Sequence, residues 1–118
     1  MNRKVYMYIQ CMVTHMGCHI QYILLHTVDN VTFKELLYEL KEVTDWWFFG
    51  KVVNISQAQL LTIQRDGMTT DKCRALTIEK WTKLEKITWS KVVSSVFKCG
   101  MTTLGWELAA NHCKLVLN

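Results

Sequence analysis

The sequence predicts an all-α fold, a compact bundle of five or six short helices that begins near residue 31. Two observations predict it. From residue 32 onward, apolar residues recur at intervals of three and four, the spacing that places them on one face of a helix. Residues whose side chains can cap a helix precede several of these segments. The chain contains no proline, so nothing of that kind interrupts the helical pattern.

The first helix is predicted to begin after Thr32. The Thr32 hydroxyl can accept from a backbone N–H, and Glu35 can reach back to complete a capping box. A break at residues 44–45 offers a new cap, and the apolar run 46–53, weakened by Gly50, is predicted to continue this helix after a kink. The apolar residues that share one face of the first helix are Phe33, Leu36, Leu37, Leu40 and Val43.

A second capping box, Ser56 with Gln59, predicts a short helix that ends near residues 65–67. Residues 67–71 are predicted to form a turn. A longer helix follows over residues 71–86. Its predicted inward residues are Ile78, Trp81 and Leu84, and its outward residues are Lys80, Lys83, Glu85 and Lys86.

Ser90 is predicted to cap the next helix, with Trp89 just before the cap as a hydrophobic staple. This helix buries Val92, Val93, Val96 and Phe97 and ends at residues 99–100. The last helix is predicted to begin at Thr102 or Thr103, with Leu104, Leu108 and Leu115 facing the core.

The predicted core combines these apolar positions with the tryptophans. Tryptophans at helical spacing in a small bundle are assigned to the core rather than to base stacking. The core set is Leu36, Leu40, Trp47, Leu60, Ile63, Trp81, Trp89, Val93, Val96, Leu104 and Leu108.

Residues 1–30 are predicted to form a separate N-terminal extension of irregular structure, either a helix or strand against the bundle or a disordered leader. Between residues 5 and 28 there is no acidic residue, lysine or arginine, which resembles a membrane anchor. Polar residues interrupt the stretch, so a span over residues 5–28 is disfavoured but stays open. Zinc is disfavoured as well, because the spacing of the candidate ligands fits no standard pattern; these are Cys11, His15, Cys18, His19 and His26.

Composition and chemistry argue against an enzyme. The net charge of +4 is mild and gives no argument for nucleic acid. The five cysteines are odd in number and scattered, which favours a reducing, cytoplasmic location. His112 and Cys113 are neighbours in sequence, but on a helix their side chains diverge, and no orienting group accompanies them. We therefore predict no catalytic residue, metal, cofactor or small-molecule substrate.

Three phrases make the region from about residue 32 to residue 111 resemble a death domain. They are "FKELLYELKEVTDWWFFGKVVNISQAQLLTI" for the first two helices, "LTIEKWTKL" for the fourth, and "TWSKVVSSVFKCGMTTLGWEL" for the fifth and sixth. The third helix would fall between Asp66 and Lys72. Gly105 stands where the family usually has alanine. A caspase-recruitment domain or another death-fold relative is the nearest alternative, and Trp89 favours the death domain.

The resemblance implies a six-helix antiparallel Greek-key bundle of the death-fold type, over residues 31–118. It also implies homotypic binding to other death-fold domains in apoptotic or innate-immune signalling, as a noncatalytic adaptor. Three candidate faces are readable: a corner after the second helix, the outer side of the fourth helix, and an acidic row on the first. In that order their residues are Arg65, Asp66, Asp71, Lys72 and Arg74; Lys80, Lys83 and Lys86; and Glu35, Glu39 and Glu42.

Two other functions stay open. A lysine row at positions 80, 83, 86 and 91 could track the phosphates of a nucleic acid, although Glu79 and Glu85 interrupt it. The second open function is that of a membrane-anchored adaptor. Residues 5–28 would then cross a bilayer, and the bundle would remain in the cytosol.

Overall fold

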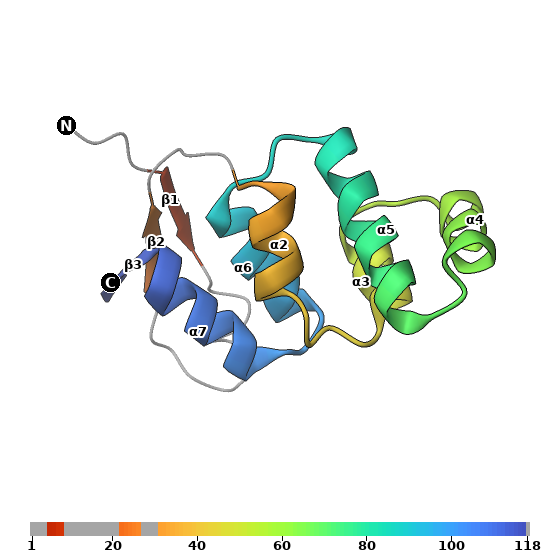
Figure 1. The fold of residues 1–118 in the computed structure, drawn as a ribbon. Helices are drawn as coiled ribbons and strands as arrows, with labels where there is room; N and C mark the ends of the chain where they lie inside the picture. Colours follow the sequence, from red (N-terminus) through yellow and green to blue (C-terminus); the bar gives the residue numbers. More distant parts are fainter. Residues whose placement is uncertain (1–4, 9–21, 27–30, 118) are drawn as a thin grey trace. The chain divides into compact units, whose positions relative to one another are not determined.

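The computed structural model describes residues 5–8, 22–26 and 31–117 (Figure 1). Within them lie six helices, which confirms the predicted all-helical domain, together with three short strands. A strand was one alternative for residues 1–30, whereas the strand after the last helix was not predicted. The helices are α2 (Phe33–Glu39), α3 (Trp46–Val52), α4 (Gln57–Gly67), α5 (Thr70–Leu84), α6 (Trp89–Lys98) and α7 (Thr102–His112). The strands are β1 (Val5–Tyr8), β2 (Tyr22–His26) and β3 (Lys114–Leu117).

The chain forms two compact units. One is Val31–Ile87, which holds α2 to α5. The other joins the described residues before position 31 to residues 88–117, and so holds the three strands with α6 and α7. The first unit begins where the predicted bundle begins, and the predicted division into residues 1–30 and 31–118 stays a prediction.

Local capping chemistry sets the helix starts in the unit Val31–Ile87. Both predicted capping boxes are present: the Thr32 and Ser56 hydroxyls accept from the N–H groups of Glu35 and Gln59, at 3.1 and 3.2 Å. Asp45 also caps a helix, accepting from the N–H of Phe48 at 3.0 Å. Therefore α3 is a separate helix, and the predicted kinked continuation of the first helix is wrong.

The third of the six described helices is α4, which was predicted as the second helix. The stretch from Asp66 to Lys72, where a third helix was expected, instead ends α4 and begins α5. Met68 has a φ of +71° at this corner, and Thr69 caps α5 by accepting from the N–H of Lys72 at 3.2 Å. The turn is therefore shorter than the predicted 67–71.

An aromatic pair lies in the core of this unit. The ring of Phe49 packs edge-on against Trp81, with centroids 5.5 Å apart, and both are almost fully buried. The predicted core residues Leu36, Leu40, Leu60, Ile63 and Trp81 are buried. Trp47 is only half-buried, because Phe49 is the residue of α3 that points inward. Leu84, predicted to face inward, is 48% exposed at the last turn of α5.

In the second unit, β1, β2 and β3 form an antiparallel sheet in the order β1-β2-β3. Tyr6 pairs with Leu25, and Leu24 pairs with Leu115. The final helix ends at His112, so placing Leu115 on it was wrong. Along α6, Val92, Val93, Val96 and Phe97 are buried as predicted; on α7, Leu108 is buried and Leu104 is half-buried.

The start of α6 differs from the prediction. Thr88 is the cap, and its hydroxyl accepts from the N–H of Lys91 at 3.4 Å. Trp89 is the first helical residue rather than a staple before the cap, and Ser90 is buried within the first turn. The Trp89 indole is also buried and stacks on His112 of α7, with ring centroids 3.6 Å apart and planes 4° from parallel.

Candidate protein-interaction surface

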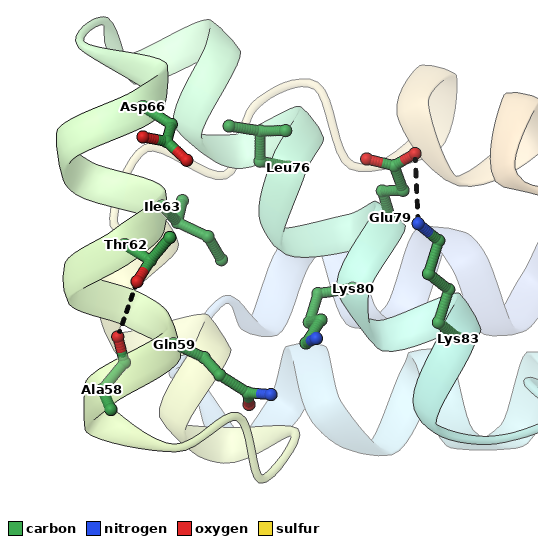
Figure 2. A pocket seen from close by; sticks show the side chains of 9 residues that line it. All are labelled: Ala58, Gln59, Thr62, Ile63, Asp66, Leu76, Glu79, Lys80 and Lys83. Atoms are coloured by element: carbon green, nitrogen blue, oxygen red, sulfur yellow. Dashed lines mark hydrogen bonds and ion pairs between the residues drawn. The ribbon is translucent and has the colours of Figure 1, made fainter.

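A groove of about 350 Å³ runs between α4 and α5 (Figure 2). Its position follows from the turn at Met68, which sends α5 back beside α4. Ala58, Ile63 and Leu76 form apolar parts of its wall. The polar residues that line it are Gln59, Thr62, Asp66, Glu79, Lys80 and Lys83. The groove therefore combines an apolar surface with charges of both signs.

Several of these polar groups already have partners. The Gln59 carbonyl accepts from the Ser56 N–H at 3.3 Å, and the Thr62 hydroxyl donates to the Ala58 carbonyl at 3.2 Å. Lys83 lies 3.8 Å from Glu79, one turn away on α5. An exposed pair of this kind contributes at most about 1 kcal/mol to stability. The ammonium of Lys80, in contrast, forms no ion pair with the described residues.

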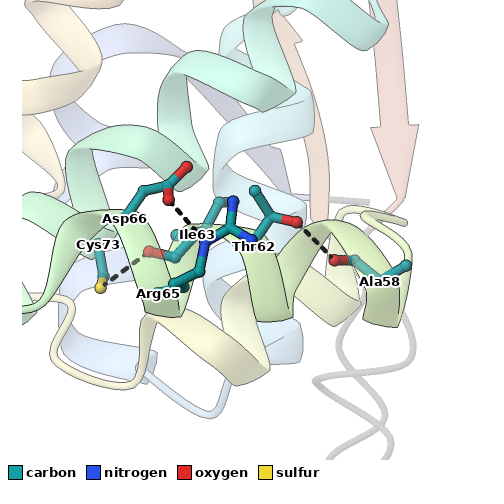
Figure 3. A network of polar contacts seen from close by, with 6 residues as sticks. All are labelled: Ala58, Thr62, Ile63, Arg65, Asp66 and Cys73. Carbon is teal, nitrogen blue, oxygen red and sulfur yellow. Dashed lines mark hydrogen bonds and ion pairs between the residues drawn. The ribbon is translucent and has the colours of Figure 1, made fainter.

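The predicted corner after α4 divides into exposed and structural residues. The Arg65 guanidinium donates to the Asp66 carboxylate at 3.0 Å, and both side chains are more than half exposed (Figure 3). Figure 3 also shows the Cys73 thiol, which donates to the Ile63 carbonyl at 3.5 Å and joins the two helices. Lys72 is exposed. Arg65, Asp66 and Lys72 are thus available to a partner.

Arg74 belongs to the protein interior rather than to this surface. Its side chain is 13% exposed, and it donates to the Val43 carbonyl at 3.1 Å and to Asp71 at 2.9 Å. This role could not be predicted from the local pattern, because Val43 lies 31 residues away along the chain. Asp71 remains exposed but is paired with Arg74.

The predicted acidic row on the first helix is not continuous. The Glu35 carboxylate accepts from the Thr32 N–H at 2.9 Å and so completes the cap of α2. Glu39 is half-buried at the last residue of α2. Glu42 is exposed and lies after the helix has ended. Of the three, Glu42 is the exposed residue that lies outside the helix and its cap.

The predicted lysine row is also divided. Lys80 is half-buried in the groove, Lys83 is exposed beside Glu79, and Lys86 is exposed after α5 has ended. Lys91 belongs to the other unit, on α6. No single described helix therefore presents the whole row.

The groove itself was not predicted. Lys80, Lys83 and Asp66 were identified as surface charges, but Gln59 was read as a capping residue and Ile63 as core. The groove forms because α4 and α5 pack side by side after the turn that ends α4. The sequence indicated where α4 ends, but it did not indicate how the two helices pack. A repeat of small and polar residues at positions 58, 59, 62 and 66 is the one signal that could have identified a face of α4.

Most of residues 5–28, where a membrane span stayed open, lie outside the described residues. No helix in the described part of the chain is long and apolar enough to cross a membrane. The described residues also hold no group of three potential metal ligands. The candidate ligands Cys11, His15, Cys18 and His19 lie outside the described residues.

Comparisons of the chain with protein-family models, curated proteins and solved structures found no match.

Proposed function

We propose that this chain is a noncatalytic death domain that assembles with other death domains, further copies of itself included, as an adaptor in intracellular signalling. The observation that carries the proposal is the surface of α4 and α5. This surface presents Arg65, Asp66 and Lys72 to solvent beside a groove that holds Lys80, which forms no ion pair with the described residues. Charged groups of both signs on a rigid helical unit suit specific recognition between proteins.

The positions of the helices support the resemblance on which the proposal rests. The three quoted phrases fall on α2 to α4, on α5, and on α6 and α7. Trp81 in the second phrase and Trp89 in the third are both buried. The tryptophans that made the pattern specific therefore have structural roles.

Gly105, the departure from the family pattern, has a local physical reason. A Cβ atom at this position would lie 2.7 Å from the ring of Phe97, which is buried on α6. An alanine here would need a smaller or displaced ring opposite it. Gly105 is therefore compatible with the last two helices of a death domain. The Phe97 ring occupies the space that the alanine methyl group usually fills.

Assembly through such faces has a simple thermodynamic form. A surface contact between exposed charges is weak, so a stable assembly needs many copies that engage at once. Unlike faces that join without closing a ring generate an open helical array. We expect the assembly to grow with protein concentration and to weaken with added salt, because the charges are exposed.

The test measures light scattering of the full chain against concentration, under reducing conditions at physiological salt. Arg65→Glu and Lys72→Glu reverse charges on the proposed surface, and Lys34→Glu makes the same change on the exposed side of α2. We expect the first two variants to raise the concentration of half-assembly about tenfold or more, which corresponds to about 1.4 kcal/mol. Circular dichroism checks that helical content is unchanged.

Two results would count against the proposal. Assembly of Arg65→Glu and Lys72→Glu at the wild-type concentration would remove this surface from the interface. An equal loss in Lys34→Glu would show that net charge, and not a specific face, controls association.

A further inference from the structure

Lys80 is unusual among the cations of the α4–α5 groove. Its side chain is half-buried, and the wall around it includes Ile63 and Leu76. Glu79, the nearest acidic residue in sequence, is engaged by Lys83 at 3.8 Å. Because apolar walls lower the local dielectric constant, an opposite charge brought to this ammonium is attracted more strongly than it would be on an open surface.

Gln59 adds neutral donors at the same place. Its carbonyl oxygen is occupied by the Ser56 N–H, which leaves the two N–H groups of its amide for other acceptors. Figure 2 shows this amide reaching from α4 towards Lys80 across the groove. The N-terminus of α4, where Gln59 lies, also carries the positive end of the helix dipole. Three sources of positive potential therefore meet at this end of the groove.

The other end of the groove carries a carboxylate. Asp66 lies in the last turns of α4, where the helix dipole is negative, and its carboxylate faces the groove (Figure 2). One oxygen of this carboxylate accepts from Arg65 at 3.0 Å, and the second can accept from another cation. A ligand that matches this arrangement carries a carboxylate for the Gln59–Lys80 end and a cation near Asp66. A protein segment with adjacent basic and acidic residues has this chemistry.

The chain itself carries such a segment. In the described residues, every carboxylate except those of Glu42 and Glu107 has an interaction partner. Glu42 is exposed in the turn after α2 and follows the exposed Lys41, whose ammonium lies 4.4 Å from the centre of the Tyr38 ring. Glu107 lies on α7 with no basic residue within one helical turn. Glu42 is therefore the better match to the groove.

We propose that the Gln59–Lys80 end of the α4–α5 groove binds the Glu42 carboxylate of a second copy of this chain, with Lys41 of that copy beside Asp66. The inference rests on the assembly proposed above and specifies one of its contacts. Glu42 and Lys80 do not pair within one copy. Each copy thus offers both a groove and a carboxylate, so the contact is head-to-tail and can propagate.

Charge exchange between two variants tests this contact in the full chain. Glu42→Lys alone places a cation opposite the Lys80 ammonium of the neighbouring copy. Lys80→Glu alone places a second carboxylate opposite Glu42 of the neighbouring copy. Each variant is expected to raise the half-assembly concentration in light scattering about tenfold or more. An equimolar mixture restores both attractive pairs in alternating order, so it should assemble near the wild-type concentration. The double variant Glu42→Lys/Lys80→Glu should do the same by itself.

Glu107→Lys is the matched control, because Glu107 is the other carboxylate without a partner among the described residues; this variant should assemble as the wild type does. Failure of the mixture and of the double variant to recover assembly would overturn the contact, as would loss of assembly in Glu107→Lys alone. If Arg65→Glu prevents assembly while Glu42→Lys and Lys80→Glu do not, this inference fails and the proposed function stands. A wild-type chain that stays monomeric at every concentration would overturn both.

Discussion

Arg74 on α5 donates a hydrogen bond to the main-chain carbonyl of Val43, 3.1 Å away, and so fastens α5 to the segment between α2 and α3. The same guanidinium donates to Asp71 at 2.9 Å. Val43 is itself buried. A carbonyl in the link between two helices needs a partner when it is withdrawn from water, and Arg74 supplies one across 31 residues of sequence.

Arg74→Ala is expected to destabilise the protein by about 2 kcal/mol, because it removes a charged donor from a partly buried carbonyl. The free energy of unfolding, measured in urea, checks this value. Arg65→Ala is the control, since its exposed pair with Asp66 should contribute less than about 1 kcal/mol. An equal effect of the two substitutions would show that the Val43 contact has no special weight.

Gly105→Ala is expected to destabilise the protein despite the better helix propensity of alanine. Alanine gains about 1 kcal/mol over glycine within a helix. Forcing a methyl group to 2.7 Å from the Phe97 ring costs about 1 to 3 kcal/mol, and this second term should be the larger. In a double-mutant cycle, Phe97→Leu should relieve part of the cost of Gly105→Ala. Strict additivity of the two substitutions would contradict the packing explanation.

Ser56→Ala is expected to cost about 1 kcal/mol through loss of the α4 cap. The substitution removes the hydroxyl that accepts from the Gln59 N–H at 3.2 Å. Ser56→Thr retains a hydroxyl and should remain within a few tenths of the wild-type free energy of unfolding. Equal stability of the alanine variant and the wild type would mean that the capping box does not hold the start of α4.

Sequence reasoning succeeded where the deciding contacts are local. The pairs Thr32–Glu35 and Ser56–Gln59 lie three residues apart, so their capping chemistry could be read directly and located the starts of α2 and α4. The buried face of α6 was equally readable from its spacing. In each case one helical turn contains all the information required.

Prediction from the sequence failed where neighbouring residues could take the same role, or where residues distant in the sequence come into contact. Thr88 and Ser90 both offer a capping hydroxyl to the same helix, and only the observed backbone shows that Thr88 is the cap and Ser90 is buried. In α3, four aromatic residues stand in a row, and Trp47 was predicted to point inward, whereas Phe49 is the residue that packs against Trp81. The groove at Lys80 and the burial of Arg74 arise from tertiary packing, which periodicity does not encode.

Cys113 gives a pH-dependent prediction. Burial at the end of α7 raises the pKa of this thiol from 9.0 to about 11, because the charged thiolate is poorly solvated there. The contribution of this thiol to stability is present below the unfolded pKa of 9.0 and is lost as the pH rises towards about 11. Cys113→Ser should lack this alkaline decline, which urea unfolding at a series of pH values measures.

Alkylation by iodoacetamide provides an independent check of the same thiol. At a pH near 9.0, Cys113 should react much more slowly in the folded chain than in urea, as followed by mass spectrometry of its peptide. Equal rates in the two states would contradict the protected, high-pKa thiol.

Sedimentation velocity of the full chain is the most direct test of whether this protein assembles through charged faces. It is recorded from low to high micromolar protein concentration at two salt concentrations. We expect a weight-average sedimentation coefficient that rises with concentration and falls when salt is added, because the contacts join exposed ionic groups. A single species of monomer mass at every concentration and at both salt concentrations would contradict it.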